Sequence, residues 1–522
     1  MPWLVNKFLR EFSMTADPGN ENNPKPGLLG ALLPVAVTMT LMLVQLIVFD
    51  EFAPHIPLVL GTAFSGVLAW SIGYKWRQME TGLFHVVHIG LPSVAILMTV
   101  GMIIGTWILS GTVPLLIYYG LKMITPQYFP LAAMLITSVV SVAIGTSWGT
   151  VGTVGLALVG IGDGLGIPAY LTGGAIVSGA FFGDKMSPLS DTTNLAPAVT
   201  STKLFSHIRN MMATAVPAMV ITAVVYWGMG LEYADQTLHT SRMSTIVGGL
   251  EKQFVFHPFL LIPALLVIIL AVKRFPALPT LFVGMLAGAV TAMIAQDASV
   301  HQIFTVMQNG YESATGIEAV DRLLSKGGIQ SMMWTISLVL IALAFGGILE
   351  KSRCLEVILN SVIGWVRGRF SLVAISTGGA VGTNLITGDP YLAIALPGRM
   401  FSPVYRGKGL STLNLSRSIE EGGTLINPLV PWSAGGAFTA AALGIPTLVY
   451  APMAIACWLS PLIGLFYAGL GWFMPEADQD ERRQWQQDGE LIMTGNEVVN
   501  ADELDVEELE KAFDKYRSAW KT

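Results

Sequence analysis

The chain has 522 residues, of which 52% are hydrophobic and 12% are charged, and its mean hydropathy is +0.60. A soluble domain carries about 25% charged residues, so this composition excludes an ordinary water-soluble protein and indicates a polytopic membrane protein in contact with the lipid bilayer. The net charge is −6, but residues 476–522 hold 14 acidic and 6 basic side chains. The acidity therefore belongs to the tail, and no basic stripe points to nucleic acid.

The first apolar run begins near residue 28. Residues 1–27 are polar and rich in Pro and Asn, so we expect a cytoplasmic N-terminal segment there rather than a cleavable signal. Because a helix needs about 20 apolar residues to cross the hydrocarbon core, the hydropathy pattern predicts simple crossings at 28–49, 54–73, 84–109, 209–230, 254–272, 275–296, 329–350 and 446–474.

Lys and Arg residues near the span ends set the predicted orientation, since they concentrate in cytoplasmic loops. Lys25 places the N-terminus in the cytoplasm, and arginines flank both ends of 371–398. That segment must enter and leave on the same side, which predicts a re-entrant hairpin. The region 129–162 must do the same from the outside, although its flanks are almost uncharged.

Each predicted hairpin has the same neighbours. A short apolar segment precedes it (112–124 or 355–366), and a crossing broken by Gly and Pro follows it (168–199 or 410–444). The chain is thus expected to be an all-α protein with ten crossings in two inverted repeats, 28–230 and 254–474, joined by an extracytoplasmic connection, 231–253. Broken segments at matching positions of inverted halves indicate the binding site of a transporter.

The acidic tail, 475–522, is expected to lie in the cytoplasm together with the N-terminus. Its stretch 476–500 reads as a linker. Apolar residues recur after it at helical spacing and predict an amphipathic helix: Leu504, Leu509, Phe513, Tyr516 and Trp520.

The first hairpin turns around the run from Gly145 to Thr153, which alternates glycines with hydroxyl side chains. Glycines permit close backbone approach, and the oxygens of Thr146, Ser147 and Thr150 suit a small hard cation. Close packing of helices through small residues is the alternative explanation for the same pattern.

The broken crossing that follows carries charges between apolar flanks: Asp184, Lys185 and Asp191. One charge at the bilayer centre costs about 2.5–3.5 kcal/mol, so several charges there indicate a use. Asp184 and Lys185 could neutralise each other or a neighbour. Asp191 has no cation in its own motif and is followed by Thr192, Thr193 and Asn194, which predicts a Na⁺ ligand or a proton carrier.

The second half offers a different set of polar residues. Those expected to form a second half-site or to meet a substrate are Asn384, Thr387, Asp389 and Asn427, although Asp389-Pro390 could simply shape a turn. Glu420 and Glu421 could pair with Arg417. Trp148 and Trp432 could wall a solute path or pack in the core.

Motifs of membrane enzymes and ATP-driven pumps are missing from the sequence. We find no Walker A loop, nucleophile elbow, dinucleotide fingerprint or HExxH placed where it could act. Two cysteines give no disulfide or zinc framework. The sequence therefore predicts that the protein is not an enzyme and needs no cofactor besides transported ions.

The run from Gly145 to Thr153, and above all Gly183-Asp184-Lys185-Met186-Ser187-Pro188-Leu189-Ser190-Asp191-Thr192-Thr193-Asn194-Leu195-Ala196-Pro197, resembles the NhaC-type Na⁺/H⁺ antiporter family. The resemblance covers about residues 28–474. It implies membership of the ion transporter superfamily, with inverted repeats, opposed hairpins and a bacterial cytoplasmic membrane location, and it is compatible with a homodimer.

Two functions follow as hypotheses. The first is Na⁺/H⁺ antiport, with Na⁺ bound at Asp191 and neighbouring oxygens from Thr146, Ser147, Thr150, Thr192, Thr193 and Asn194. The second is Na⁺- or H⁺-coupled transport of a small organic acid of the malate/lactate type or an amino acid, whose carboxylate would meet Asn384, Thr387, Asn427 and Arg417.

Overall fold

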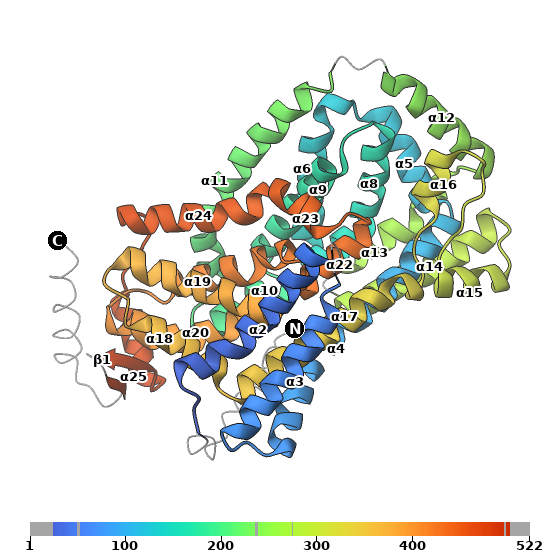
Figure 1. Ribbon diagram of the computed structural model, residues 1–522. Helices are drawn as coiled ribbons and strands as arrows, with labels where there is room; N and C mark the ends of the chain where they lie inside the picture. The colour runs from blue at the N-terminus through green and yellow to red at the C-terminus, as the bar shows by residue number, and fades with distance from the viewer. Residues whose placement is uncertain (1–23, 50–52, 235–237, 274, 495–496, 502–522) are drawn as a thin grey trace.

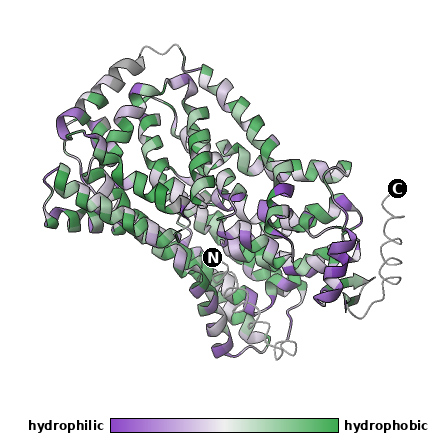
Figure 2. Cartoon of the chain, turned by 180° about the vertical axis from the view of Figure 1, so that it is seen from behind, coloured by the Kyte–Doolittle hydropathy of each residue, from purple (hydrophilic) through white to green (hydrophobic). Residues whose placement is uncertain are grey.

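A computed structural model describes residues 24–49, 53–234, 238–273, 275–494 and 497–501. The described chain is mostly helical (Figure 1). Within it, seven helices are long and apolar enough to cross a membrane, and two bent helix pairs raise the number to nine. Hydrophobic residues occur along most of the helices, as the hydropathy colouring of Figure 2 shows. The structure is therefore that of a polytopic membrane protein.

The first half begins with two apolar helices and one long helix, which packs along α17 (Ile329–Lys351) of the second half. Its elements are α2 (Leu28–Val48), α3 (His55–Ser71), α4 (Trp76–Leu109), α5 (Thr112–Met123), η2 (Pro126–Tyr128), α6 (Phe129–Ile144), α7 (Ser147–Thr150), the π-helix η3 (Val151–Gly155), α8 (Leu156–Gly164), α9 (Ala169–Met186), α10 (Asp191–Val199) and α11 (Leu204–Leu231).

Close packing of α6 against α9 positions the first broken crossing. A side chain at Gly179 or Gly183 would collide with the backbone of α6, at 2.1 Å from Met134 O and 2.5 Å from Ser138 O. The Ser141 hydroxyl donates to Ala180 O at 2.5 Å. Because small residues let the two backbones approach so closely, the end of α9 is held against the turn that follows α6.

The connection between the halves contains a helix, α12 (Leu238–Gln253), which bends by 100° into the next span. The second half then continues through η4 (Pro258–Leu261), α13 (Ile262–Val272), α14 (Ala277–Ala295), α15 (Val300–Asn309), α16 (Glu318–Leu324), α17 (Ile329–Lys351), α18 (Cys354–Ile363), α19 (Arg369–Thr387), α20 (Pro390–Gly407), α21 (Leu413–Glu420), the π-helix η5 (Glu421–Leu425), η6 (Asn427–Leu429), α22 (Ala434–Leu443), α23 (Thr447–Tyr450), η7 (Ala451–Met453) and α24 (Ile455–Leu470).

The segment expected to be a hairpin, 371–398, forms two antiparallel neighbours, α19 and α20, joined at Gly388 and Asp389. Gly388 has a φ of +67°, a conformation that glycine adopts without strain. The 19 residues of α19 extend about 28 Å at 1.5 Å per residue. Each arm of this helix pair is therefore about as long as the hydrocarbon core is thick. In the first half, by contrast, α6 packs mainly along α9 and not along α8, the second arm of the hairpin expected at 129–162.

The number of simple spans is lower than the ten crossings expected. The two broken crossings are divided into shorter helices, and α3 and α24 have 17 and 16 residues. The ten crossings therefore stay a prediction.

The structure of the tail shows that two expectations were wrong. Residues 476–500 are not a linker but contain α25 (Gln479–Gln487) and a two-stranded antiparallel sheet, β1 (Leu491–Thr494) and β2 (Glu497–Asn500), so the fold is not entirely α-helical. Trp485 and Ile492 form a small core with Ala477 and Ala501, which is why this acidic segment folds. The amphipathic helix expected from Leu504 to Trp520 lies outside the described residues.

We call residues 475–501 the tail module. Glu490 of this module forms an ion pair at 2.8 Å with Arg406, which lies almost fully buried at the end of α20. Glu481 accepts hydrogen bonds from the Thr412 backbone N–H at 3.0 Å and its hydroxyl at 3.2 Å, just before α21. The tail module therefore holds the end of α20 and the start of α21, where the second broken crossing begins.

Candidate functional site

A cavity of about 540 Å³ lies where the interrupted helices meet. The turn at 145–148, the break at 187–191, the start of α20 and the segment around Thr424 and Asn427 all line it. Of the residues predicted for the site, seven line this cavity: Thr146, Ser147, Asp184, Asp191, Thr192, Asn194 and Asn427. Elements from both halves of the chain therefore build one site.

Asp191 is the most accessible carboxylate of the cavity. It is the first residue of α10, where Ser190 caps the helix by accepting from the Thr193 N–H at 3.4 Å. Its side chain is exposed, and within the described part of the chain it makes no hydrogen bond or ion pair. A carboxylate at this position is available to bind a cation or a proton from the cavity.

Asp184 is held in place instead. Its Oδ2 accepts from the backbone N–H of Ser147 at 3.0 Å and from the Ser147 hydroxyl at 2.6 Å. These bonds join the end of α9 to the turn after α6. The serine predicted as a cation ligand thus orients the second carboxylate of the cavity.

The other hydroxyl and amide residues of the first half divide into two groups. Thr150 donates to Thr146 O at 3.0 Å, and Thr193 donates to the last carbonyls of α9 at 3.2 Å, so both support the backbone and do not line the cavity. Asn194 uses its Nδ2 to donate to Pro188 O at 2.9 Å and Ser190 O at 2.7 Å, which leaves its Oδ1 for a ligand.

Most of the residues predicted for the second half-site form hydrogen bonds with the backbone or with one another. Asn384 donates to Gly423 O at 2.7 Å, and its Oδ1 accepts from Asn427 Nδ2 at 2.7 Å. Thr387 donates to Thr383 O at 2.8 Å. Asp389 caps α20 by accepting from the Leu392 N–H at 2.7 Å, so the turn-shaping alternative describes its contacts.

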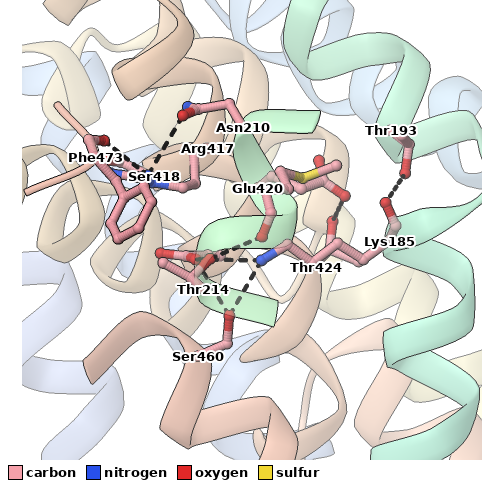
Figure 3. Close-up of polar contacts among 12 residues, drawn as sticks. Lys185, Thr193, Asn210, Thr214, Arg417, Ser418, Glu420, Thr424, Ser460 and Phe473 are labelled. Atoms are coloured by element: carbon pink, nitrogen blue, oxygen red, sulfur yellow. Dashed lines mark hydrogen bonds and ion pairs between the residues drawn. The ribbon is translucent and has the colours of Figure 1, made fainter. Parts of the chain in front are cut away.

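Among the buried charges, Lys185 pairs with a neighbouring carboxylate, which was one of the two alternatives, and Arg417 does not form the pair suggested for it. Lys185 does not pair with Asp184, because adjacent residues of a helix point in different directions; its Nζ lies 3.2 Å from Glu421 Oε1. Arg417 does not pair with either glutamate, since it donates to Phe473 O at 3.1 Å. Figure 3 shows Arg417 turned towards Phe473.

Glu421 has further partners besides Lys185. The Thr214 hydroxyl donates to its Oε1 at 2.5 Å, and the Ser460 hydroxyl does so at 3.2 Å. The ion pair is almost completely buried, with 0% and 2% of the two side chains exposed. It links α9 to the π-helix η5 of the second broken crossing.

Sequence reasoning missed Tyr391 and Thr424, which also line the cavity. Thr424 directly follows Gly422-Gly423, and Tyr391 follows Asp389-Pro390. Both residues carry a hydroxyl close to glycines or a proline that interrupt a helix. The same pattern, Thr146 after Gly145, had indicated a site residue in the first half, so it could have indicated these two as well. Trp148 lines the cavity and stacks on Phe438 at 4.7 Å, whereas Trp432 does not line it.

The site can be compared with known proteins. Residues 179–472 match the Na⁺/H⁺ antiporter family. The Na⁺/H⁺ antiporter NhaC of Alkalihalophilus pseudofirmus is 41% identical over 441 residues, which cover 84% of this chain and 95% of that protein. NhaC of Bacillus subtilis is 36% identical over 437 residues, covering 83% and 96%. The arginine/ornithine antiporter ArcD of Halobacterium salinarum is 37% identical over 460 residues, covering 88% and 95%.

The family match, residues 179–472, includes the charged stretch from Asp184 to Asp191 and the whole of the second broken crossing. The chain therefore belongs to the Na⁺/H⁺ antiporter family.

Proposed function

We propose that this protein exchanges Na⁺ for H⁺ across the membrane. The observation that carries the proposal is the charge of the cavity: two carboxylates, Asp184 and Asp191, line it, while no Lys, Arg or His side chain of the described residues does. Carboxylate, hydroxyl and amide oxygens are the ligands that a hard cation prefers. An organic anion would lack a positive partner there, because Arg417 is bonded elsewhere.

Asp191 is the carboxylate for which Na⁺ and H⁺ compete in this proposal. Oxygens of Thr146, Thr192 and Asn194 complete the Na⁺ site, and Ser147 contributes by holding Asp184. Thr150 and Thr193 support the backbone of the site. Because each ion displaces the other from one carboxylate, exchange follows without a further coupling device.

We further propose that the two halves are inverted repeats, with the boundaries 28–230 and 254–474, in a bacterial cytoplasmic membrane with both termini in the cytoplasm. The order of elements supports this: α5, α6, the broken α9–α10 pair and α11 follow α4 as α18, α19, the broken α21–α22 pair and α24 follow α17. The cavity reaches residues 202–204 and 275–277, beside Lys203 and Lys273. With these lysines in the cytoplasm, the conformation is inward-facing.

Transport of a cationic amino acid is the second candidate. The relative from Halobacterium salinarum is named an arginine/ornithine antiporter, and an acidic cavity also suits a guanidinium or ammonium group. A cavity of about 540 Å³ has room for more than one Na⁺ ion. Counterflow of labelled arginine or ornithine, with malate and lactate for the organic-acid alternative, separates these substrates from Na⁺.

The test uses proteoliposomes that report Na⁺-driven proton flux. We expect Asp191→Asn to abolish this flux, because an amide neither binds Na⁺ with a charge nor exchanges a proton. Asp163→Asn is the matched control, since Asp163 pairs with Arg322 on the surface at 3.2 Å and does not line the cavity. Flux at the wild-type level in Asp191→Asn would refute the assignment.

A further inference from the structure

Two helices that begin at the cavity, one from each half of the chain, pack against each other: α10 and α20. Their first residues, Asp191 and Pro390, both line the cavity. Farther along, a side chain at Gly398 of α20 would lie 2.6 Å from Cγ1 of Val199, the last residue of α10. The two helices therefore run in the same direction, away from the cavity.

Glu490 of the tail module joins the far ends of these two helices. Its Oε1 accepts a hydrogen bond from the hydroxyl of Ser201, just after α10, and its Oε2 pairs with Arg406 of α20 at 2.8 Å. Only 3% of the Arg406 side chain is exposed. Because a buried cation needs a paired carboxylate, the ion pair fixes Glu490 at the end of α20 and directs its other oxygen to Ser201.

The backbone of Glu490 is fixed as well. Its N–H donates to Trp485 O at 2.9 Å, and its carbonyl accepts from the Ala501 N–H at 2.9 Å. Strand β1, which follows Glu490, lies so close to α20 that a side chain at Gly407 would collide with Met493 O. Glu490 is therefore a rigid point of attachment for the turn after α10.

That turn forms one edge of the cavity. Ser201 has a φ of +55°, a left-handed conformation that residues other than Gly and Asn rarely adopt, and its bond to Glu490 stabilises this conformation. The Thr202 N–H donates back to Pro197 O at 2.8 Å. Residues on both sides of Ser201 line the cavity: Pro197, Ala198, Thr202 and Leu204. A change in the Ser201 turn therefore moves the cavity wall and the end of the helix that begins with Asp191.

We propose that Glu490 is a positioning residue for the cation site. By holding Ser201 and Arg406 together, it keeps α10 in register with α20, and through this contact the tail module sets the apparent affinity for the transported cation. The inference rests on the proposed function. Asp191 remains the one carboxylate for which Na⁺ and H⁺ compete, and Glu490 itself binds no ion.

The test changes Ser201, because this leaves the Glu490–Arg406 pair intact. Ser201→Gly adopts the left-handed conformation but lacks the hydroxyl, and Ser201→Ala lacks the hydroxyl without adding flexibility. Both should raise the Na⁺ concentration for half-maximal proton flux in proteoliposomes by about two- to tenfold, as expected for the loss of one hydrogen bond, and leave the maximal rate near that of the wild type. Ser201→Asn should retain the wild-type affinity, because Asn adopts this conformation and its amide can donate to Glu490.

A second variant addresses Glu490 directly. Glu490→Ala combined with Arg406→Met removes the carboxylate without leaving an unpaired buried charge, and it should raise the half-saturating Na⁺ concentration in the same way. Glu476→Gln is the matched control within the tail module. Glu476 pairs with Arg369 at the start of α19, at 3.0 Å, and neither residue lines the cavity, so its affinity should equal that of the wild type.

Hydrogen exchange of the peptide covering residues 197–204 measures the turn without transport. It should be faster in Ser201→Ala than in the wild type and in Ser201→Asn. A wild-type half-saturating concentration in Ser201→Gly or in the double variant would overturn the inference, as would an equal shift in Glu476→Gln or a lower maximal rate at unchanged affinity. Absence of Na⁺-driven flux in the wild type would instead refute the proposed function, and hydrogen exchange would still decide whether Glu490 holds the turn.

Discussion

Removing one partner of the Lys185–Glu421 pair should destabilise the protein far more than removing a surface ion pair of the same length. Lys185 lies 3.2 Å from Glu421, and Arg322 lies 3.2 Å from Asp163. Their exposure differs: 0% and 2% for the buried pair, 70% and 30% for the surface pair. The two pairs therefore isolate the effect of burial at constant distance.

The expected magnitudes follow from Coulomb's law and desolvation. At 3.2 Å the attraction is about 5 kcal/mol at an effective dielectric constant of about 20, and about 1 kcal/mol in water. Loss of one partner from a buried pair costs about 3–5 kcal/mol, because the remaining charge stays in the interior. An exposed pair contributes about 0–1 kcal/mol. Lys185→Met should therefore lower the unfolding temperature strongly.

The assay is a double-mutant cycle measured by thermal unfolding in detergent. Lys185→Met and Glu421→Gln should each destabilise the protein, and the double variant should be closer to the wild type than either single variant. The amide oxygen introduced by Glu421→Gln would still accept from the Thr214 and Ser460 hydroxyls, which keeps these donors satisfied. Equal coupling in the buried cycle and in a parallel Arg322→Met, Asp163→Asn cycle would refute the reasoning.

Two further predictions concern single residues. Gly145→Ala should destabilise the site by about 1–3 kcal/mol and reduce transport, because Gly145 has a φ of +76° and a new Cβ would lie 2.4 Å from Leu189 Cβ; Gly378→Ala, with nothing within 4 Å, is the control whose equal loss would contradict this. Asp321 accepts from the Thr315 N–H and hydroxyl at 2.7 Å, and these bonds lower the pKa of its carboxyl. Its stabilising effect is therefore present above the ordinary pKa of about 4 and is lost as the pH falls through the lower folded value. Asp321→Asn should accelerate hydrogen exchange in that loop at neutral pH, and unchanged exchange would argue against the role.

Periodicity and charge placement predicted the local features of this fold. The arginines on both sides of 371–398 predicted a re-entrant hairpin; α19 and α20 are joined by a tight turn as expected, while the re-entrance itself stays a prediction. Glycines and prolines predicted the interruptions after Gly145 and around Ser187. These features depend on nearby residues, so one sequence contains the information for them.

The pairing of buried charges could not be predicted in the same way. Lys185 and Glu421 are 236 positions apart, and only the packing of α9 against η5 brings them together. Thr424 and Tyr391 reach the cavity for the same reason. The acidic composition of 476–500 also concealed its small core, in which Trp485 packs with Ile492, Ala477 and Ala501.

The long separation between Lys185 and Glu421 affects how the protein is made. A ribosome that adds about 5–20 residues per second needs on the order of 10–50 s to proceed from Lys185 to Glu421. During that interval the ammonium of α9 has no counter-ion from the second half, so this helix must stay next to water or to the insertion machinery. The ion site is thus completed late in biosynthesis, and a product truncated before α21 would keep an uncompensated charge by which proteases could recognise it.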